Sequence, residues 1–302
     1  MKPGTEGLLL LFPAFPWFLI LPSFLPSASS YDATGRRVLK TVGSAKTRYI
    51  YDGWQCIEEY LAPTAASGFI DAPNRQYVNG NNMDEALQYK YRAMTDPADV
   101  YAINTQTATV TVVGEYDEDT LNGHDIVLWD SDTGARIYSI ADNAEHSGGN
   151  TAITVTSGTG LGDFTVANTD YVILYQPAAY YYHANVQGNT VAITDANGNI
   201  KEEVTYDVYG RLTSVKVDGT PLTQTNGLVT VGTYFAGSLT KNARLFQGRD
   251  LDEESGLYYF RNRQYDPVHG RFLTRDLLLI PSIVAFLASL NDPPPCPPCS
   301  PW

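Results

Sequence analysis

RLFQGRDLDEESGLYYFRNRQYDPVHGRFLTRD, from Arg244 to Asp276, is the stretch of sequence that decides how this chain is expected to fold. A polar, acidic segment lies between two glycines, and LYYFRNRQY then places aromatic residues on both faces, which is typical of a β-strand. A corner follows, in which Asp266 precedes a proline and Gly270 opens the next strand. This order favours a hairpin, because the carboxylate accepts backbone N–H groups, proline fixes φ and glycine allows positive φ.

The same corner occurs three times along the chain. The first copy consists of Tyr31, Asp32, Gly35 and Arg36, the second of Tyr206, Asp207, Gly210 and Arg211, and the third, one residue longer, of Tyr265, Asp266, Gly270 and Arg271. Tyr51-Asp52-Gly53 is a partial copy. A short repeat that ends in a hairpin turn cannot bury its own apolar face, so we expect the copies to stack on one another.

These residues resemble the RHS/YD-repeat family, which is named for the Tyr-Asp dipeptide. The last part of the chain is similar to the RHS repeat-associated core signature, carried here by Gly248, Arg249, Gly256, Tyr258, Tyr259, Arg261 and Asp276. The resemblance covers residues 31–95 and 176–276. It implies an all-β fold, in which stacked YD-repeat hairpins form an open strip of an RHS-type β-shell.

The segment 96–176 interrupts this resemblance. It contains six apolar stretches separated by polar turns, and nothing in it indicates a helix. Antiparallel strands at this spacing predict a small inserted sandwich or barrel. The expected strands are 107–113, 125–130, 135–140, 151–157, 164–167 and 170–176.

The two ends of the chain differ from the rest. Residues 1–30 have the order of a signal peptide, an apolar run followed by small residues, although a wrongly assigned start would give the same pattern. We therefore expect a secreted or cell-surface protein, or a cytoplasmic one if the start is wrong. Residues 277–302 are an apolar run followed by a proline-rich tail, for which we expect disorder. The repeat segments between them span 31–95 and 177–276. In the second segment Asn197-Gly198 favours a type I′ turn, and residues 212–243 favour weaker strands.

Composition and motifs argue against several kinds of chemistry. The net charge of −13 excludes a nucleic-acid partner, since no basic stripe can displace phosphate counterions. The GTGLG loop at 158–162 is not followed by a helix, so we expect a hairpin loop there. Ser-x-x-Lys at 238–241 lacks its partner motifs, and DSDTG at 130–134 favours a hairpin turn over a calcium loop. The four histidines have no metal-ligand spacing, and we expect no metal and no cofactor.

One activity is implied by the resemblance. Many members of the family end the core in a self-cleaving aspartyl site built from paired Asp-Pro-x-Gly motifs. Asp276 aligns with the first of these aspartates, but Leu277, Leu278 and Leu279 follow it and the second motif is absent. We therefore expect no autoproteolysis.

The sequence thus predicts a non-enzymatic structural or interaction module of an RHS/YD-repeat protein. Its expected partner is an encapsulated or neighbouring polypeptide. An alternative is that the inserted domain binds a cell-surface carbohydrate or receptor, which aromatic residues clustered on one exposed face would favour. A residual aspartyl autoprotease is a third hypothesis and would require a second carboxylate near Asp276.

Overall fold

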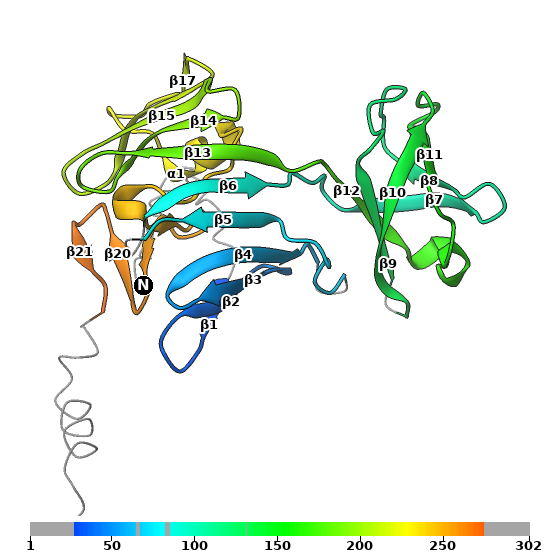
Figure 1. Ribbon diagram of the computed structural model, residues 1–302, viewed down its shortest axis with the longest axis horizontal. Coiled ribbons are helices and arrows are strands. Elements are labelled where there is room, and N and C mark those ends of the chain that lie inside the picture. Colours follow the sequence, from blue (N-terminus) through cyan, green and yellow to red (C-terminus); the bar gives the residue numbers. More distant parts are fainter. Residues whose placement is uncertain (1–26, 65–66, 82–84, 131, 275–302) are drawn as a thin grey trace, which may run out of the picture.

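A computed structural model describes residues 27–64, 67–81, 85–130 and 132–274 (Figure 1). These residues form mostly antiparallel β-structure, with one short α-helix. They divide into an eleven-stranded sheet, a closed six-stranded barrel and a four-stranded sheet. None of the helices in this part of the chain is long and apolar enough to cross a membrane.

The large sheet is built from hairpins in sequence order. Its strands run β1-β2-β3-β4-β5-β6-β13-β14-β15-β16-β17, so the barrel leaves the sheet between β6 and β13 and the chain then returns to the same place. The bounds are β1 Ser27–Tyr31, β2 Arg37–Val42, β3 Ala45–Asp52, β4 Gln55–Ala62, β5 Arg75–Asn79, β6 Ala86–Tyr91, β13 Ala178–Ala184, β14 Thr190–Asp195, β15 Ile200–Tyr206, β16 Leu212–Val217 and β17 Thr220–Pro221.

The first two Tyr-Asp corners adopt one and the same turn. At Asp32, the side-chain Oδ1 accepts the N–H groups of the second and fourth residues that follow, and the backbone carbonyl accepts the N–H of Gly35. Asp207 and Gly210 repeat these bonds, with φ of 84° at Gly35 and 90° at Gly210. A register shift accompanies each turn, as expected when glycine occupies the left-handed position of a bulge.

Two further turns use the same bonds without a Tyr-Asp pair. Asn185 with Gly188, and Asp195 with Gly198, reproduce both the side-chain and the backbone hydrogen bonds. The prediction of a type I′ turn at Asn197-Gly198 is wrong, because φ is positive at Gly198 but not at Asn197. The preceding aspartate decides the turn, since its carboxylate holds two backbone N–H groups.

The barrel has its own apolar interior. Its strands are β7 Ala98–Asn104, β8 Thr109–Val113, β9 Asp125–Asp130, β10 Gly134–Asn143, β11 Asn150–Val155 and β12 Asp170–Leu174, closed in the order β10-β11-β8-β7-β12-β9. The prediction of a strand at 164–167 is wrong: two 3₁₀ turns, η1 Leu161–Asp163 and η2 Val166–Asn168, occupy that region. The sixth strand is instead β7, whose central residues Val100 to Ile103 are apolar without alternation.

A hydrophobic joint fastens the barrel to the large sheet. Val127, Trp129 and Val172, on the outside of β9 and β12, are at most 1% exposed because they pack against Ile70 and its neighbours. Arg92, just beyond β6, also pairs with a carboxylate of β9. The barrel is therefore fixed against the sheet through buried side chains as well as through its two chain connections.

The remaining residues, 231–272, cross one face of the large sheet, and we call them the strap and that face the inner face. The strap contains α1 Val231–Gly237, η3 Phe246–Gly248, β18 Asp250–Leu251, β19 Tyr258–Phe260, β20 Arg263–Asp266 and β21 Arg271–Phe272. The expectation of weaker strands over 212–243 is right for β16 and β17 but wrong for α1. Thr230 caps the N-terminus of α1 by accepting the N–H of Thr233. The sheet curls around the strap (Figure 1).

Candidate functional site

The strap is held to the inner face by buried polar groups rather than by apolar contacts alone. Arg37 is 2% exposed, and its guanidinium donates to both carboxylate oxygens of Asp252, at 2.8 and 2.7 Å. Its faces lie against the rings of Tyr49 and Tyr259, with 5.0 and 4.3 Å from the guanidinium carbon to the ring centres. Burial alone would raise the pKa of Asp252, but Arg37 and Lys40 outweigh it and hold that pKa below its ordinary value.

A second anchor surrounds Glu202, which is fully buried on β15. Its carboxylate accepts hydrogen bonds from the hydroxyls of Ser238, Thr240 and Tyr234 and from the backbone N–H of Thr240. All four donors belong to the strap and all are neutral. Ser238 and Thr240, within the Ser-x-x-Lys segment at 238–241, thus bind a buried carboxylate.

A third anchor joins the middle of the sheet to the strap. Glu59 on β4 pairs with Arg75 at 3.1 Å and accepts the hydroxyl of Tyr77 at 2.6 Å. Burial would raise the pKa of Glu59, but Arg75, Tyr77 and Arg244 lower it below its ordinary value. Arg75 also donates to the backbone carbonyl of Lys241 in the strap. At this anchor the charges of Glu59 and Arg75 therefore neutralise each other.

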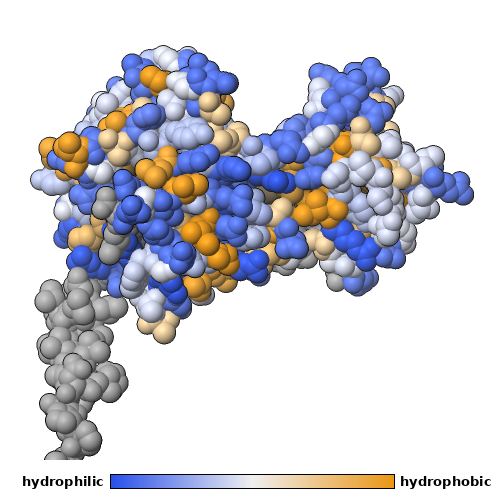
Figure 2. All heavy atoms as spheres, in the orientation of Figure 1, coloured by the Kyte–Doolittle hydropathy of each residue, from blue (hydrophilic) through white to orange (hydrophobic). Residues whose placement is uncertain are grey.

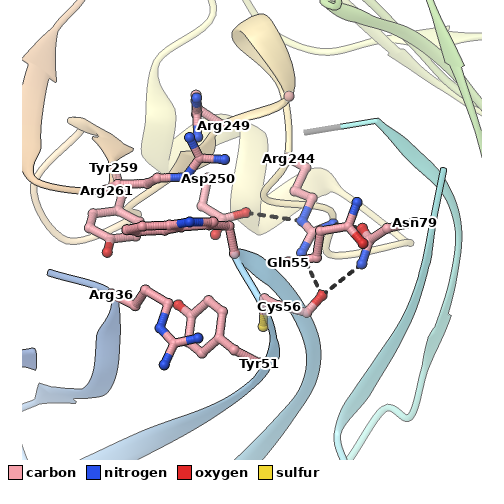
Figure 3. Close-up of a pocket in the computed structure, with 12 residues that line it drawn as sticks. Arg36, Tyr51, Gln55, Cys56, Asn79, Arg244, Arg249, Asp250, Tyr259 and Arg261 are labelled. Atoms are coloured by element: carbon pink, nitrogen blue, oxygen red, sulfur yellow. Dashed lines mark hydrogen bonds and ion pairs between the residues drawn. The ribbon is translucent and has the colours of Figure 1, made fainter. Parts of the chain in front are cut away.

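A pocket of about 50 Å³ lies between the strap and the ends of strands β3, β4 and β5 (Figure 3). The sheet contributes Arg36, Tyr51, Trp54, Gln55, Cys56 and Asn79, and the strap contributes Arg244, Gly248, Arg249, Asp250, Tyr259 and Arg261. Arg244 donates to Asn79 Oδ1 at 2.8 Å and to the carbonyl of Cys56 at 3.3 Å, and its Nε lies 3.5 Å from Asp250. Burial raises the pKa of Asp250 and of the Cys56 thiol.

The structure brings the repeat turns and the core signature together. Tyr258 donates its hydroxyl to the carbonyl of Gly210 at 3.0 Å, and Tyr259 donates to the carbonyl of Gly35 at 3.3 Å. These two glycines occupy the same position in two different turns. Adjacent tyrosines of the signature thus bind the first and the last Tyr-Asp turn of the sheet.

The predicted site residues have different environments. Arg36 and Arg211 each pair through Nε with the aspartate of their own turn, at 2.6 and 2.5 Å. The three tyrosines are not equivalent: Tyr31 is half exposed beside Tyr259, Tyr206 donates to the carbonyl of Thr190, and Tyr265 donates to that of Tyr209.

The longer third corner lies between β20 and β21, and the described residues of the signature also belong to the strap. Asp266 pairs with His269, Arg271 lies opposite Asp266 in β21, and Gly270 has a φ of 63°. Gly248, Arg249 and Arg261 line the pocket, Gly256 occupies a left-handed turn position, and Asp276 lies outside the described residues.

Sequence reasoning missed the buried charges. Arg37, Glu59, Arg75, Glu202, Arg244, Asp250 and Asp252 were not singled out, although each anchors the strap or lines the pocket. One signal was available: on β4 and β15 a glutamate stands next to another glutamate, so one of each pair must face inward.

The other sequence motifs occupy ordinary turns. Residues 130–134 join β9 to β10, where Asp130 accepts the N–H groups of Asp132 and Thr133. The prediction of a hairpin loop at 158–162 is wrong: GTGLG runs into η1, and the strands on either side, β11 and β12, pair with other strands and not with each other. Asp117, Glu145 and His146 bring ligand atoms within 4.8 Å of one another on exposed loops of the barrel, a common arrangement without an ion.

Hydrophilic and intermediate residues cover most of the barrel face shown in Figure 2. Its exposed large apolar side chains, among the described residues, are Tyr101, Val113, Ile137 and Val166. A single aromatic ring is no cluster, so the observation that would favour the binding-module alternative is missing from this part of the chain.

No protein-family model matches the chain. It is 30% identical over 97 residues to a tRNA3(Ser)-specific nuclease, WapA, of Bacillus spizizenii, and equally identical over the same length to the tRNA nuclease WapA of Bacillus subtilis; these matches cover 32% of this chain and 3% of either nuclease. It is 34% identical over 105 residues to YibJ of Escherichia coli, covering 34% of this chain and 37% of that protein. The chain therefore spans a small part of the curated relatives it matches.

Among solved structures, the Tc holotoxin pore of Photorhabdus luminescens matches 83% of this chain and 9% of its own, with 14% identity and a TM-score of 0.27. A TM-score this low does not establish that the two folds are the same.

Proposed function

Part of this chain is homologous to RHS/YD-repeat proteins, and from that premise we propose that it is a structural, non-catalytic module of such a protein. In this proposal the eleven-stranded sheet is a strip of stacked YD-repeat hairpins and 96–176 is a domain inserted into the strip. The module presents a surface to a neighbouring or enclosed polypeptide.

The observation that carries this proposal is the link between the signature tyrosines and the repeat turns. Tyr258 and Tyr259 each bind the carbonyl of the glycine in a Tyr-Asp turn. The two parts of the family resemblance thus form one structure, in which the strap braces the sheet. Such bracing serves a scaffold, since it fixes the curvature of a sheet that has two open edges.

Three observations support the absence of catalysis. Glu59, Glu202 and Asp252 are all buried, and structural partners occupy their oxygens. The nuclease activity in the names of the Bacillus relatives belongs to proteins of which this chain covers 3%. A net charge of −13 also opposes binding to tRNA.

We further propose export to the cell surface or the medium, because residues 1–30 have the order of a signal peptide. Amino-terminal sequencing of secreted protein is expected to begin near Tyr31. Intact Met1 in a cytosolic fraction would contradict export without bearing on the structural role.

The structural role is tested with the purified full chain in two assays. Incubation with tRNA is expected to leave the RNA intact, and limited trypsin digestion is expected to spare the bonds after Arg37 and Arg244, which are 2% and 8% exposed. Arg48 and Arg271, which are exposed, serve as internal controls for protease activity. Cleavage of tRNA that co-purifies with the chain would overturn the proposal, as would equal cutting at buried and exposed arginines.

A further inference from the structure

The pocket at the junction of strap and sheet is lined by four arginines and one acid, Asp250, in a chain whose net charge is −13. One arginine comes from the sheet and three come from the strap: Arg36 from the first Tyr-Asp turn, Arg244 and Arg249 from the middle of the strap, and Arg261 from the turn between β19 and β20. They surround the opening from different sides (Figure 3). Only the folded junction brings them together.

We propose that this pocket binds an oxyanion, a carboxylate or phosphate group that protrudes from a larger ligand, on the guanidinium groups of Arg36, Arg249 and Arg261.

Each of the four guanidiniums lies over an aromatic ring. The distances from the guanidinium carbon to the ring centre are 5.2 Å for Arg36 and Tyr51, 3.7 Å for Arg244 and Tyr77, 5.0 Å for Arg249 and Phe260, and 5.6 Å for Arg261 and Trp54. A ring against the flat face of a guanidinium leaves the N–H groups at its edge for oxygen atoms. Arginine has five such groups, so each side chain can keep an existing partner and still donate to a ligand.

Arg261 occupies a backbone position that favours glycine. Its φ is 58° in the two-residue turn between Phe260 and Arg263, which are paired. A left-handed conformation costs a residue other than glycine roughly 1 kcal/mol. Strain of this kind is concentrated at functional sites, and here it holds a guanidinium above Trp54 at the mouth of the pocket.

The size of the pocket limits the ligand. About 50 Å³ is room for a few water molecules, since roughly 10–15 Å³ of such space holds one, and a carboxylate or phosphate group is of comparable size. We expect the rest of the ligand to lie beside Trp54, which is 44% exposed.

Asp250 is the carboxylate among the residues that line the pocket. Its Oδ1 accepts no hydrogen bond among the described residues, and burial raises its pKa. The lining has four guanidinium groups and this one carboxylate, which lies beside Arg244, and Arg36 also keeps its ion pair with Asp32 outside the lining.

The test titrates the full chain with inorganic phosphate in one arm and with succinate in the other, at constant ionic strength, and follows tryptophan fluorescence. A saturable change is expected in at least one arm, and it should disappear in Trp54→Phe. Phosphate alone, succinate alone or both identify the group that the pocket prefers.

Two substitutions of Arg261 test whether the anion binds in this pocket. Arg261→Gln is expected to raise the dissociation constant about tenfold, the size of one charge-assisted hydrogen bond. Arg261→Gly also removes the guanidinium but relieves the strained φ, so loss of binding in a stably folded protein is expected there too. Arg263→Gln is the matched control, because Arg263 stacks on Phe272 and does not line the pocket. No saturable change in either arm, or equal weakening by Arg261→Gln and Arg263→Gln, would overturn the proposal.

Discussion

A single substitution placed in two equivalent turns separates the strain of the turn from the packing of the strap. Gly198 and Gly210 occupy the same position of the same turn, with φ of 82° and 90°. A Cβ at Gly198 would meet nothing within 4 Å, whereas a Cβ at Gly210 would lie 2.6 Å from Cγ of Phe246. Phe246 cannot withdraw freely, because its ring packs among those of Tyr206, Tyr258 and Tyr265.

The expected free energies follow from these two environments. Alanine in the left-handed region costs about 1 kcal/mol, partly offset by the lower entropy of the unfolded chain, so Gly198→Ala should destabilise by about 1 kcal/mol or less. Gly210→Ala adds the cost of overpacking against Phe246, about 1–3 kcal/mol. Urea unfolding of both variants measures the difference in the free energy of unfolding. Equal losses in the two variants would refute the packing of the strap against this turn.

Three further predictions concern carboxylates. Asp252→Asn removes the partner of buried Arg37 and should lower the free energy of unfolding by roughly 3–5 kcal/mol at neutral pH. Because the folded-state pKa of Asp252 is depressed, this contribution is present above about pH 4 and is lost as the pH falls. In urea titrations at acid pH the variant and the wild type should therefore converge. Asp170→Asn should stabilise the protein by roughly 0.2–1 kcal/mol at neutral pH, since Asp170 faces Asp99 across β12 and β7. Burial, and then Asp99, raise the folded-state pKa of Asp170. The gain should therefore vanish below about pH 4, where the wild-type group is protonated in both the folded and the unfolded state. Intact mass spectrometry of purified protein should show no fragment released near Asp276, and a fragment present in wild type but absent from Asp276→Asn would contradict the absence of self-cleavage.

The repeated turns were predictable because their chemistry is local. An aspartate accepts N–H groups two and four residues ahead, and glycine supplies the positive φ three residues ahead, so the sequence Asp-x-x-Gly nearly determines the turn. The same locality explains the error at Asn197-Gly198. The dipeptide alone favours type I′, but Asp195 lies within reach and its carboxylate selects the other turn.

The strap and its anchors could not be predicted in this way. Arg37 and Asp252 are 215 residues apart, and neither lies in a pattern that names the other. Glu202 is satisfied by hydroxyl and amide groups alone, so no complementary charge in the sequence points to it. The barrel is an intermediate case, because alternating apolar residues indicate most of its strands. Strand β7, Ala98–Asn104, has four apolar residues in a row and no alternation. The sequence FTVA resembles a strand because composition alone does not separate a short strand from a 3₁₀ turn.

The contacts of Tyr258 and Tyr259 explain in physical terms why these two tyrosines of the core signature are adjacent. Successive side chains of a strand point to opposite sides, so Tyr258 and Tyr259 on β19 reach in different directions. One binds the turn between β15 and β16 and the other the turn between β1 and β2, which lie near opposite ends of the eleven-stranded order. Strand β19 therefore stands between the two ends of the curled sheet and sets the distance between them. Any insertion between the two tyrosines would turn one of them away from its glycine, which is why this dipeptide must remain contiguous for the strap to brace the sheet.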